Sequence, residues 1–172
     1  LCPCDALEAA RAVRAAAAID GPVYIRLARL ATPVFSEGMP FEVGKANVLR
    51  EGTDAALLTC GLMVETCMDA ARLLEEQGIR SAVINMHTIK PLDEAAVRRL
   101  AGQMPLFTVE EHSIIGGLGD AVASVVAAHG GRLRKIGIPD CFGQSGKPEQ
   151  LLDYYGLSAE KISKTVLETL RG

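Results

Sequence analysis

The sequence predicts an α/β protein built on a five-stranded, mostly parallel sheet, with helices on both faces and one antiparallel strand. From residue 46 onward, short strand-like segments alternate with segments of helical period, which is the pattern of parallel βαβ units with right-handed crossovers. A short turn at residues 51–54 joins two of the predicted strands and makes them antiparallel. The chain of 172 residues, 49% hydrophobic and 23% charged, is long enough for one hydrophobic core.

The first 38 residues predict a helix, a strand and a linker. Asp5 can cap the helix, and Glu8 three residues later completes a capping-box pattern. The residues at helical spacing are Leu7, Ala10, Val13 and Ala17, and the Asp-Gly-Pro sequence at residues 20–22 ends the helix. Alternating side chains over residues 23–27 then predict a strand.

This first strand has no predicted partner nearby, because the following residues 31–40 contain Pro33, Gly38 and Pro40 and are typical of a linker. A strand alone leaves backbone groups unpaired on both edges. We therefore expect residues 1–38 to be the tail of an upstream domain whose sheet lies outside this chain, and residues 39–172 to form the main domain. The chain does not begin with Met, which agrees with this expectation.

The main domain begins with the predicted hairpin of residues 46–49 and 55–59. Further strands are expected at residues 81–85, 106–109 and 133–138. The helices between and after them are expected at residues 63–77, after the cap Asp93, at residues 117–129, and after the cap Ser158.

Charge and hydropathy exclude two classes of partner. The net charge of −3 comes without a cluster of Lys and Arg, so nucleic acid is not an expected partner. No apolar run approaches the roughly 20 residues of a membrane span, and the first residues are not those of a signal peptide. We therefore expect no membrane partner and a cytoplasmic location.

Five cysteines are present, at positions 2, 4, 60, 67 and 141. No two have the C-x2-C spacing of a zinc site, and the C-x-C pair at residues 2–4 is a weak signal for one. The favoured interpretation is that they are reduced thiols serving as small apolar residues, with a metal or redox site as the alternative.

Polar residues follow several of the predicted strands, at the edge where open α/β sheets bind ligands. His87, Glu111, His112 and Asp140 could converge there, and a His beside carboxylates can act as an acid-base pair. The alternative is that these residues make caps, turns or subunit contacts.

Two glycine-rich loops carry weaker signals. Gly116, Gly117 and Gly119 open a helix after a strand, which suits an anion or close packing, but the spacing is not that of a dinucleotide site. The loop at residues 142–146 contains Ser145 but lacks the G-x-S-x-G pattern of a hydrolase, so it is predicted to be structural.

Arg26 and Arg29 are the remaining candidates. Arg29 lies just after the strand predicted at residues 23–27, where a guanidinium can bind a phosphate or carboxylate through two parallel hydrogen bonds. An ion pair at the surface or at an interface is the alternative.

Taken together, four segments resemble the transketolase family. GPVYIRL at residues 21–27 is similar to the end of the family's pyrimidine-binding domain. The segments HTIKPLD at residues 87–93, VEEHS with the following GGLG at residues 109–119, and PDCFGQSG at residues 139–146 resemble successive connections of its C-terminal domain. The resemblance covers essentially the whole chain and is closest to split transketolases, whose C-terminal half is a separate subunit. Family loops often have Glu where this chain has Gln144.

The resemblance implies transfer of a two-carbon ketol unit between sugar phosphates, with thiamine diphosphate and a divalent metal such as magnesium supplied by the parent enzyme. It implies that neither cofactor is bound by this chain alone, since those sites lie in other domains of the family, and that no catalytic residue is present here. The chain would be inactive alone and would serve packing and dimerisation beside an N-terminal subunit or domain. Arg29 matches the family's arginine for the substrate phosphate.

Other interpretations of the parent enzyme and of the chain's role remain open. The parent could be 1-deoxy-D-xylulose 5-phosphate synthase or the beta subunit of a 2-oxo acid dehydrogenase, and the chain could also be a dimerisation module without a catalytic role. The motifs around His87 and His112 resemble transketolase more than either sibling enzyme.

Overall fold

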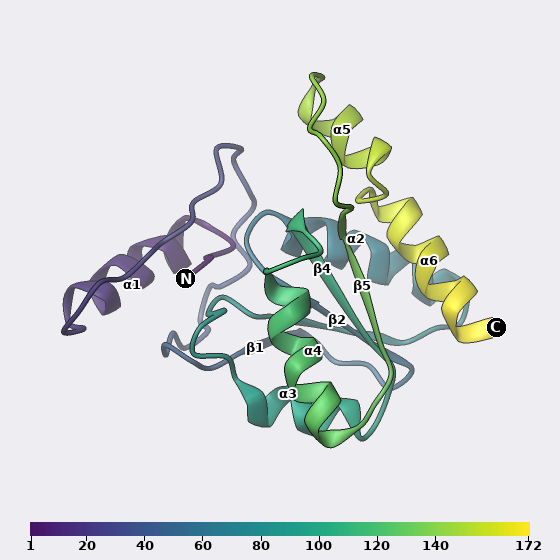
Figure 1. Cartoon of the computed structure of the whole chain (residues 1–172), viewed down its shortest axis with the longest axis horizontal. Helices are drawn as coiled ribbons and strands as arrows, with labels where there is room; N and C mark the ends of the chain where they lie inside the picture. The colour runs from purple at the N-terminus through teal and green to yellow at the C-terminus, as the bar shows by residue number, and fades with distance from the viewer.

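The computed structural model describes all residues 1–172 and contains one five-stranded mixed sheet (Figure 1). The strands are β1 (Asn47–Arg50), β2 (Ala55–Thr59), β3 (Ser81–Asn85), β4 (Leu106–Ser113) and β5 (Leu133–Ile138), in the spatial order β1-β3-β2-β4-β5. Strands β2 to β5 pair in parallel, and β1 pairs antiparallel with β3. The predicted fold class is therefore confirmed.

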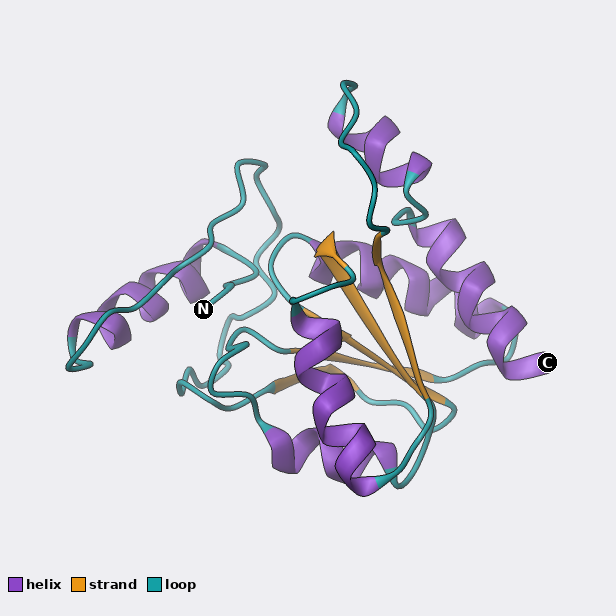
Figure 2. Ribbon diagram, in the orientation of Figure 1, coloured by secondary structure: helices purple, strands orange, loops and turns teal.

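Helices cover both faces of the sheet, as Figure 2 shows. Helices α2 (Met63–Glu76) and α6 (Ala159–Arg171) enclose one core with residues such as Leu57 and Phe107. Helices α3 (Glu94–Ala101) and α4 (Leu118–His129) enclose the other core with residues such as Leu58 and Ile84. Successive residues of β2 point to opposite faces, so this central strand contributes to both cores. Helix α5 (Pro148–Tyr154) projects beyond the end of β5 and buries no residue.

The predicted hairpin is wrong in its pairing. Strand β1 is antiparallel to its neighbour, but that neighbour is β3, with Asn47 opposite Asn85. Both edges of β2 are occupied by the parallel strands β3 and β4, so β1 joins the sheet at its outer edge. Gly52 allows this path, because a Cβ atom there would collide with the backbone of Ser81 and Ala82.

The strand predicted at residues 23–27 is also wrong, since these residues have no regular secondary structure. Their backbone bonds only with the first residue, where the Leu1 amino group donates to the Tyr24 carbonyl at 2.8 Å and the Arg26 amide donates to the Leu1 carbonyl at 2.9 Å. The side chains of Tyr24 and Leu27 are 79% and 59% exposed. The alternation that predicted a strand is present, but no sheet edge lies beside it.

Helix α1 (Ala6–Ala17) forms where predicted, with the Asp5 carboxylate accepting from the Glu8 amide at 2.8 Å. The helix lies beside the sheet domain rather than on it (Figure 1). The residues at its predicted apolar spacing, Leu7, Ala10, Val13 and Ala17, are all exposed. The apolar stripe of α1 therefore does not contribute to either core.

Two carboxylates fix residues 1–38, called here the N-terminal segment: Asp5 joins its two ends, and Glu8 attaches it to the sheet domain. Asp5 accepts from the amides of Phe35 and Ser36 at 2.8 and 2.7 Å and from the Ser36 hydroxyl at 2.8 Å. Glu8 is fully buried and accepts from the side-chain amide of Asn85, at the end of β3, at 2.8 Å. None of the helices has both the length and the apolar character needed to cross a bilayer.

Candidate functional site

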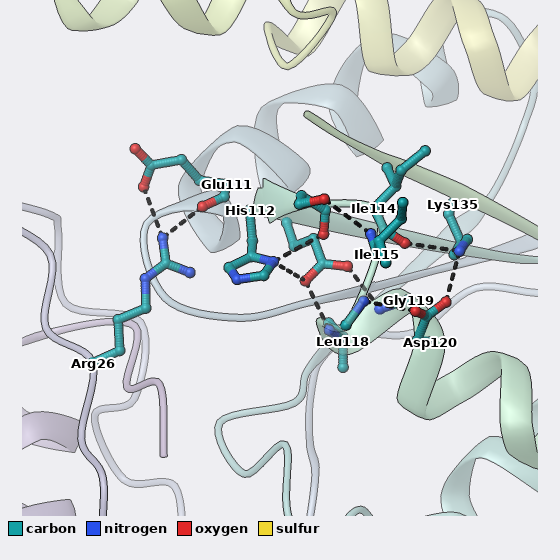
Figure 3. A network of polar contacts seen from close by, with 12 residues as sticks. Arg26, Glu111, His112, Ile114, Ile115, Leu118, Gly119, Asp120 and Lys135 are labelled. Atoms are coloured by element: carbon teal, nitrogen blue, oxygen red, sulfur yellow. Dashed lines mark hydrogen bonds and ion pairs between the residues drawn. The ribbon is translucent and has the colours of Figure 1, made fainter. Parts of the chain in front are cut away.

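The N-terminal segment and the carboxyl ends of β3 and β4 enclose a cleft of about 730 Å³. Its polar lining comes from Arg26 of the segment, Lys90 after β3, and Glu110 and His112 of β4. The cleft thus lies at the edge of the sheet where parallel α/β folds bind ligands. Figure 3 shows the polar contacts on the β4 side of this edge.

Arg26 joins the N-terminal segment to β4. Its Nη2 atom donates to the Glu111 carbonyl at 2.6 Å and lies 3.4 Å from the Glu111 carboxylate. Both side chains are partly exposed, at 33% and 41%, so the ion pair alone contributes little because water screens it. The hydrogen bond to the carbonyl fixes the path of the segment just before Arg29.

Glu110 caps the start of α4. Its buried carboxylate accepts from the amides of Leu118 and Gly119, each at 2.7 Å. Gly117 permits this arrangement, because a Cβ atom at residue 117 would collide with the Glu110 carboxylate. The amides that could have bound an external anion are therefore occupied by a side chain of the protein, which favours the packing interpretation of the glycine-rich loop.

A second contact holds the loop between β4 and α4. The Lys135 ammonium donates to Asp120 at 2.7 Å and to the Ile114 carbonyl at 2.8 Å, and Asp120 also accepts from the Gly116 amide at 2.6 Å (Figure 3). The hydrogen bond from Lys135, and then that from Gly116, lowers the pKa of the Asp120 carboxyl. These contacts fix the loop beside His112.

His112 is partly exposed at the edge of the cleft. Its Nδ1 atom donates to the Ser113 carbonyl at 2.9 Å and lies 4.0 Å from the Glu110 carboxylate. Glu110 is already bonded to two amides, so it is not free to work as a partner in proton transfer. The geometry favours a structural role for this histidine.

Arg29 differs from Arg26, Glu110 and Glu111, which form contacts within the chain. Its side chain is exposed and makes no hydrogen bond or ion pair with the rest of the chain. Arg29 lines two smaller cavities, of about 210 and 360 Å³, and Glu111 lines both as well. Gln144, from the loop before α5, lines the larger of the two. Arg29 is thus an exposed and unpaired guanidinium that borders two cavities.

The four residues predicted to converge do not form one cluster. His87 is buried, stacks on Phe41 at 4.4 Å between ring centroids, and has its Nδ1 atom 3.0 Å from the Thr88 hydroxyl. Burial lowers the pKa of His87, which favours its neutral form. Asp140 is exposed and makes no hydrogen bond or ion pair. Of the four, only His112 lines the cleft, and Glu111 contacts Arg26, which lines it as well.

The sequence did not predict that Glu110 caps α4 or that Lys90 lines the cleft. Glu110 ends a run of buried strand residues, and an acidic residue in such a run is a signal for a cap or a buried bond. Lys90 follows the β3 strand end and had no distinguishing pattern. Arg26 was considered, but its bond to Glu111 depends on a contact between residues 85 positions apart.

The residues present do not fit a diphosphate and its metal. No group of three His, Cys, Asp or Glu side chains is placed to hold a metal ion. The glycine-rich start of α4 is capped internally by Glu110. We therefore assign no step of the chemistry to a cofactor held by this chain.

The fold and its polar edge define an α/β module covered on one side by a separate N-terminal segment. Residues 44–162 match the model of the transketolase C-terminal domain, and the chain belongs to this family. This finding confirms the resemblance seen in the sequence.

Relatives extend the match over almost the whole chain. A putative transketolase C-terminal section from Methanocaldococcus jannaschii is 40% identical, covering 99% of this chain and 55% of the relative. A 1-deoxy-D-xylulose-5-phosphate synthase from Symbiobacterium thermophilum is 36% identical, covering 95% of this chain and 26% of that enzyme. A solved split-gene transketolase, described as an inactive β4 tetramer, is 40% identical with a TM-score of 0.93, covering 98% of this chain and 56% of that one.

The chain therefore spans about half the length of the curated transketolase relatives it matches. Its likeness to C-terminal sections of transketolase-type enzymes confirms the predicted class, and 1-deoxy-D-xylulose-5-phosphate synthases are also among its relatives.

Proposed function

We propose that this chain is the C-terminal part of a transketolase that transfers a two-carbon ketol unit between sugar phosphates. The observation that carries the proposal is the match over 98% of the chain, with a TM-score of 0.93, to one part of a split-gene transketolase. The unpaired guanidinium of Arg29, which borders two cavities, supports it further, since a cationic group is suited to bind the phosphate of a sugar phosphate.

The proposal includes an N-terminal subunit or domain as a partner. Thiamine diphosphate and magnesium would be held by that partner, because the residues of this chain provide no site for a metal and its diphosphate. Thiamine diphosphate supplies the carbanion chemistry when it is bound. In this proposal the chain alone is inactive and serves packing, homodimerisation and phosphate recognition, in a cytoplasmic enzyme.

Residues 1–38 are, in this proposal, the tail of the pyrimidine-binding domain. Residues 23–27 have the alternation of a strand but no sheet beside them, and the apolar stripe of α1 is exposed. Both features are explained if the preceding part of the enzyme supplies a sheet edge and an apolar surface. Residues 39–172 then form the C-terminal domain proper.

Arg29 is proposed to bind the phosphate of the substrate. The segment that carries it is fixed by the hydrogen bond from Arg26 to the Glu111 carbonyl, three residues earlier. A fixed backbone suits a residue that must bind a ligand, because only the conformational freedom of the side chain is then lost on binding.

A 1-deoxy-D-xylulose-5-phosphate synthase is the second candidate, supported by the 36% identity to such an enzyme. The two reactions differ in the donor of the two-carbon unit. The complete enzyme, with thiamine diphosphate and magnesium, should be assayed with a ketose phosphate and an aldose phosphate, with and without pyruvate. Ketol transfer without pyruvate is the expected result, and strict dependence on pyruvate would overturn the proposal in favour of the second candidate.

A further inference from the structure

The five thiols of the chain lie in different surroundings. Cys67 is buried in the core and Cys4 lies beside the carboxylates of Asp5 and Glu8, and burial is the main cause that raises the pKa of both thiols. Cys141 is exposed. Cys2 and Cys60 form the remaining pair, and they are the two thiols that share a cavity.

The backbone brings Cys2 and Cys60 together from two parts of the molecule. Cys2 belongs to the N-terminal segment, and its amide donates to the His87 carbonyl at 2.8 Å. Cys60 directly follows β2, and the next amide, that of Gly61, donates to the Cys2 carbonyl at 3.2 Å. A Cβ atom on Gly61 would lie 2.8 Å from the Cys2 sulfur, so glycine at this position makes room for the thiol.

Both thiols border a cavity of about 210 Å³ that is also lined by Arg26, Arg29 and Glu111. Each of the two cysteines is only 4% exposed, and the cavity has room for a small oxidant such as hydrogen peroxide. Arg26 supplies positive charge beside the pair.

The two sulfurs differ in their acidity. The neighbouring Cys60 thiol, and then the charge of Arg26, lowers the pKa of the Cys2 thiol, although burial opposes the shift. The Cys2 thiol is in turn the main cause that raises the pKa of Cys60, and burial adds to the shift. The pair thus has one more acidic sulfur, which is suited to attack, beside a less acidic one.

We propose that Cys2 and Cys60 are a dithiol site that hydrogen peroxide oxidises to a disulfide between the N-terminal segment and the end of β2. Cys2 loses its proton, the thiolate attacks one peroxide oxygen, the O–O bond breaks, and the departing hydroxide takes up the proton that Cys2 released to become water. Cys2 is then a sulfenic acid. The Cys60 sulfur attacks the Cys2 sulfur, the S–O bond breaks, and the departing hydroxide takes the Cys60 proton to form a second water. Two thiols are oxidised to one disulfide, and one peroxide is reduced to two waters.

The test is peroxide treatment of the purified protein with Cys141 changed to Ser, which removes the exposed thiol. We expect the intact mass to fall by two hydrogen atoms, and non-reducing peptide mapping to link Cys2 to Cys60. Dithiothreitol should reverse both results. The proposal would be overturned if Cys2 and Cys60 stayed reduced, or if Cys2 were linked to Cys4. This measurement needs no variant of Cys2 or Cys60.

Two variants separate the roles of the sulfurs. In Cys60→Ser, Cys2 cannot form the disulfide, so we expect a sulfenic acid at Cys2 that dimedone labels. The matched control Cys67→Ser removes a thiol outside the cavity and should leave the Cys2–Cys60 link intact. Equal dimedone labelling of Cys2 with and without Cys60 would show that Cys60 does not resolve the sulfenic acid, against the proposal.

Discussion

Most charged groups at the edge of the cleft form contacts within the protein. Glu110 caps α4, Asp120 bonds with Lys135, and Arg26 donates to the Glu111 carbonyl. Arg29 lies within the same region without a partner in the chain. Because the Arg29 side chain is unpaired and makes no contact that holds the fold, we expect it to bind a ligand.

Changing Arg29 to Ala in the complete enzyme is expected to raise the KM for sugar phosphates roughly ten- to hundred-fold, because a charge-assisted hydrogen bond contributes about 1.5–3 kcal/mol. Steady-state kinetics with phosphorylated and non-phosphorylated sugars measures this, and only the former should be affected. Arg14→Ala is a matched control, since Arg14 is also exposed and unpaired. An unchanged KM in the Arg29 variant would remove this residue from the substrate site.

Changing His112 to Ala is expected to leave the chemical step largely intact. The ring is bonded to the Ser113 carbonyl, and its nearest carboxylate is occupied by two amides. Single-turnover kinetics of the complete enzyme measures the step directly. A fall of about 100-fold or more, the scale of lost acid-base catalysis, would show that the structural interpretation of His112 is wrong.

Among the elements, helix α1 is held beside the sheet mainly by the carboxylates of Asp5 and Glu8. Asp5 accepts from the start of the helix and from residues 35 and 36, so one carboxylate joins the two ends of the N-terminal segment. Burial raises the pKa of Asp5, but hydrogen bonds from Glu8 and Ser36 together outweigh it, and the pKa is lowered from its usual 3.8. The stabilisation is therefore present above that value and is lost as pH falls through the lowered pKa.

Asp5→Asn imitates the protonated carboxyl, so it is expected to reduce the protection of the Phe35 and Ser36 amides at neutral pH. Hydrogen exchange of the variant and the unchanged protein, compared at each pH, measures the effect. The difference between the two should shrink as pH falls below about 3.8 and disappear once the pH is below the lowered pKa of Asp5. Asp20→Asn serves as the control, because Asp20 is exposed and makes no hydrogen bond. Equal protection at neutral pH would contradict the role of Asp5.

The start of α4 depends on a glycine. Gly117→Ala forces a methyl group against the buried Glu110 carboxylate, and we expect the free energy of unfolding to fall by about 1–3 kcal/mol. Gly143→Ala is the matched control, since nothing lies within 4 Å of a Cβ atom there. Urea denaturation of both variants measures the difference. Equal stabilities would mean that the carboxylate moves aside without cost.

The elements that sequence could predict are those with local causes. Helical period and caps such as Asp93 marked the helices of the sheet domain, and apolar runs marked its strands. The partner of β1 could not be predicted, because it depends on β2 being enclosed by β3 and β4. At the site, the position of Arg29 just after residues 23–27 made it a candidate from the sequence alone. The buried position of His87 could not be predicted, because it depends on the contact with Phe41.

For the whole molecule, two features support the proposed N-terminal partner. The N-terminal segment exposes apolar side chains, among them Val13, Tyr24 and Leu27 at 53%, 79% and 59%. The chain also spans about half the length of its transketolase relatives. Both features agree with a C-terminal part that needs an N-terminal partner to complete the enzyme.

Native mass spectrometry with thiamine diphosphate and magnesium tests this account most directly. The chain should be measured alone and mixed with the N-terminal part of the same enzyme. We predict that the chain alone, at 18.2 kDa or a multiple of it, carries no cofactor, and that the mixture gives a heavier complex that holds it. Cofactor bound to the chain alone, or no complex in the mixture, would contradict the account.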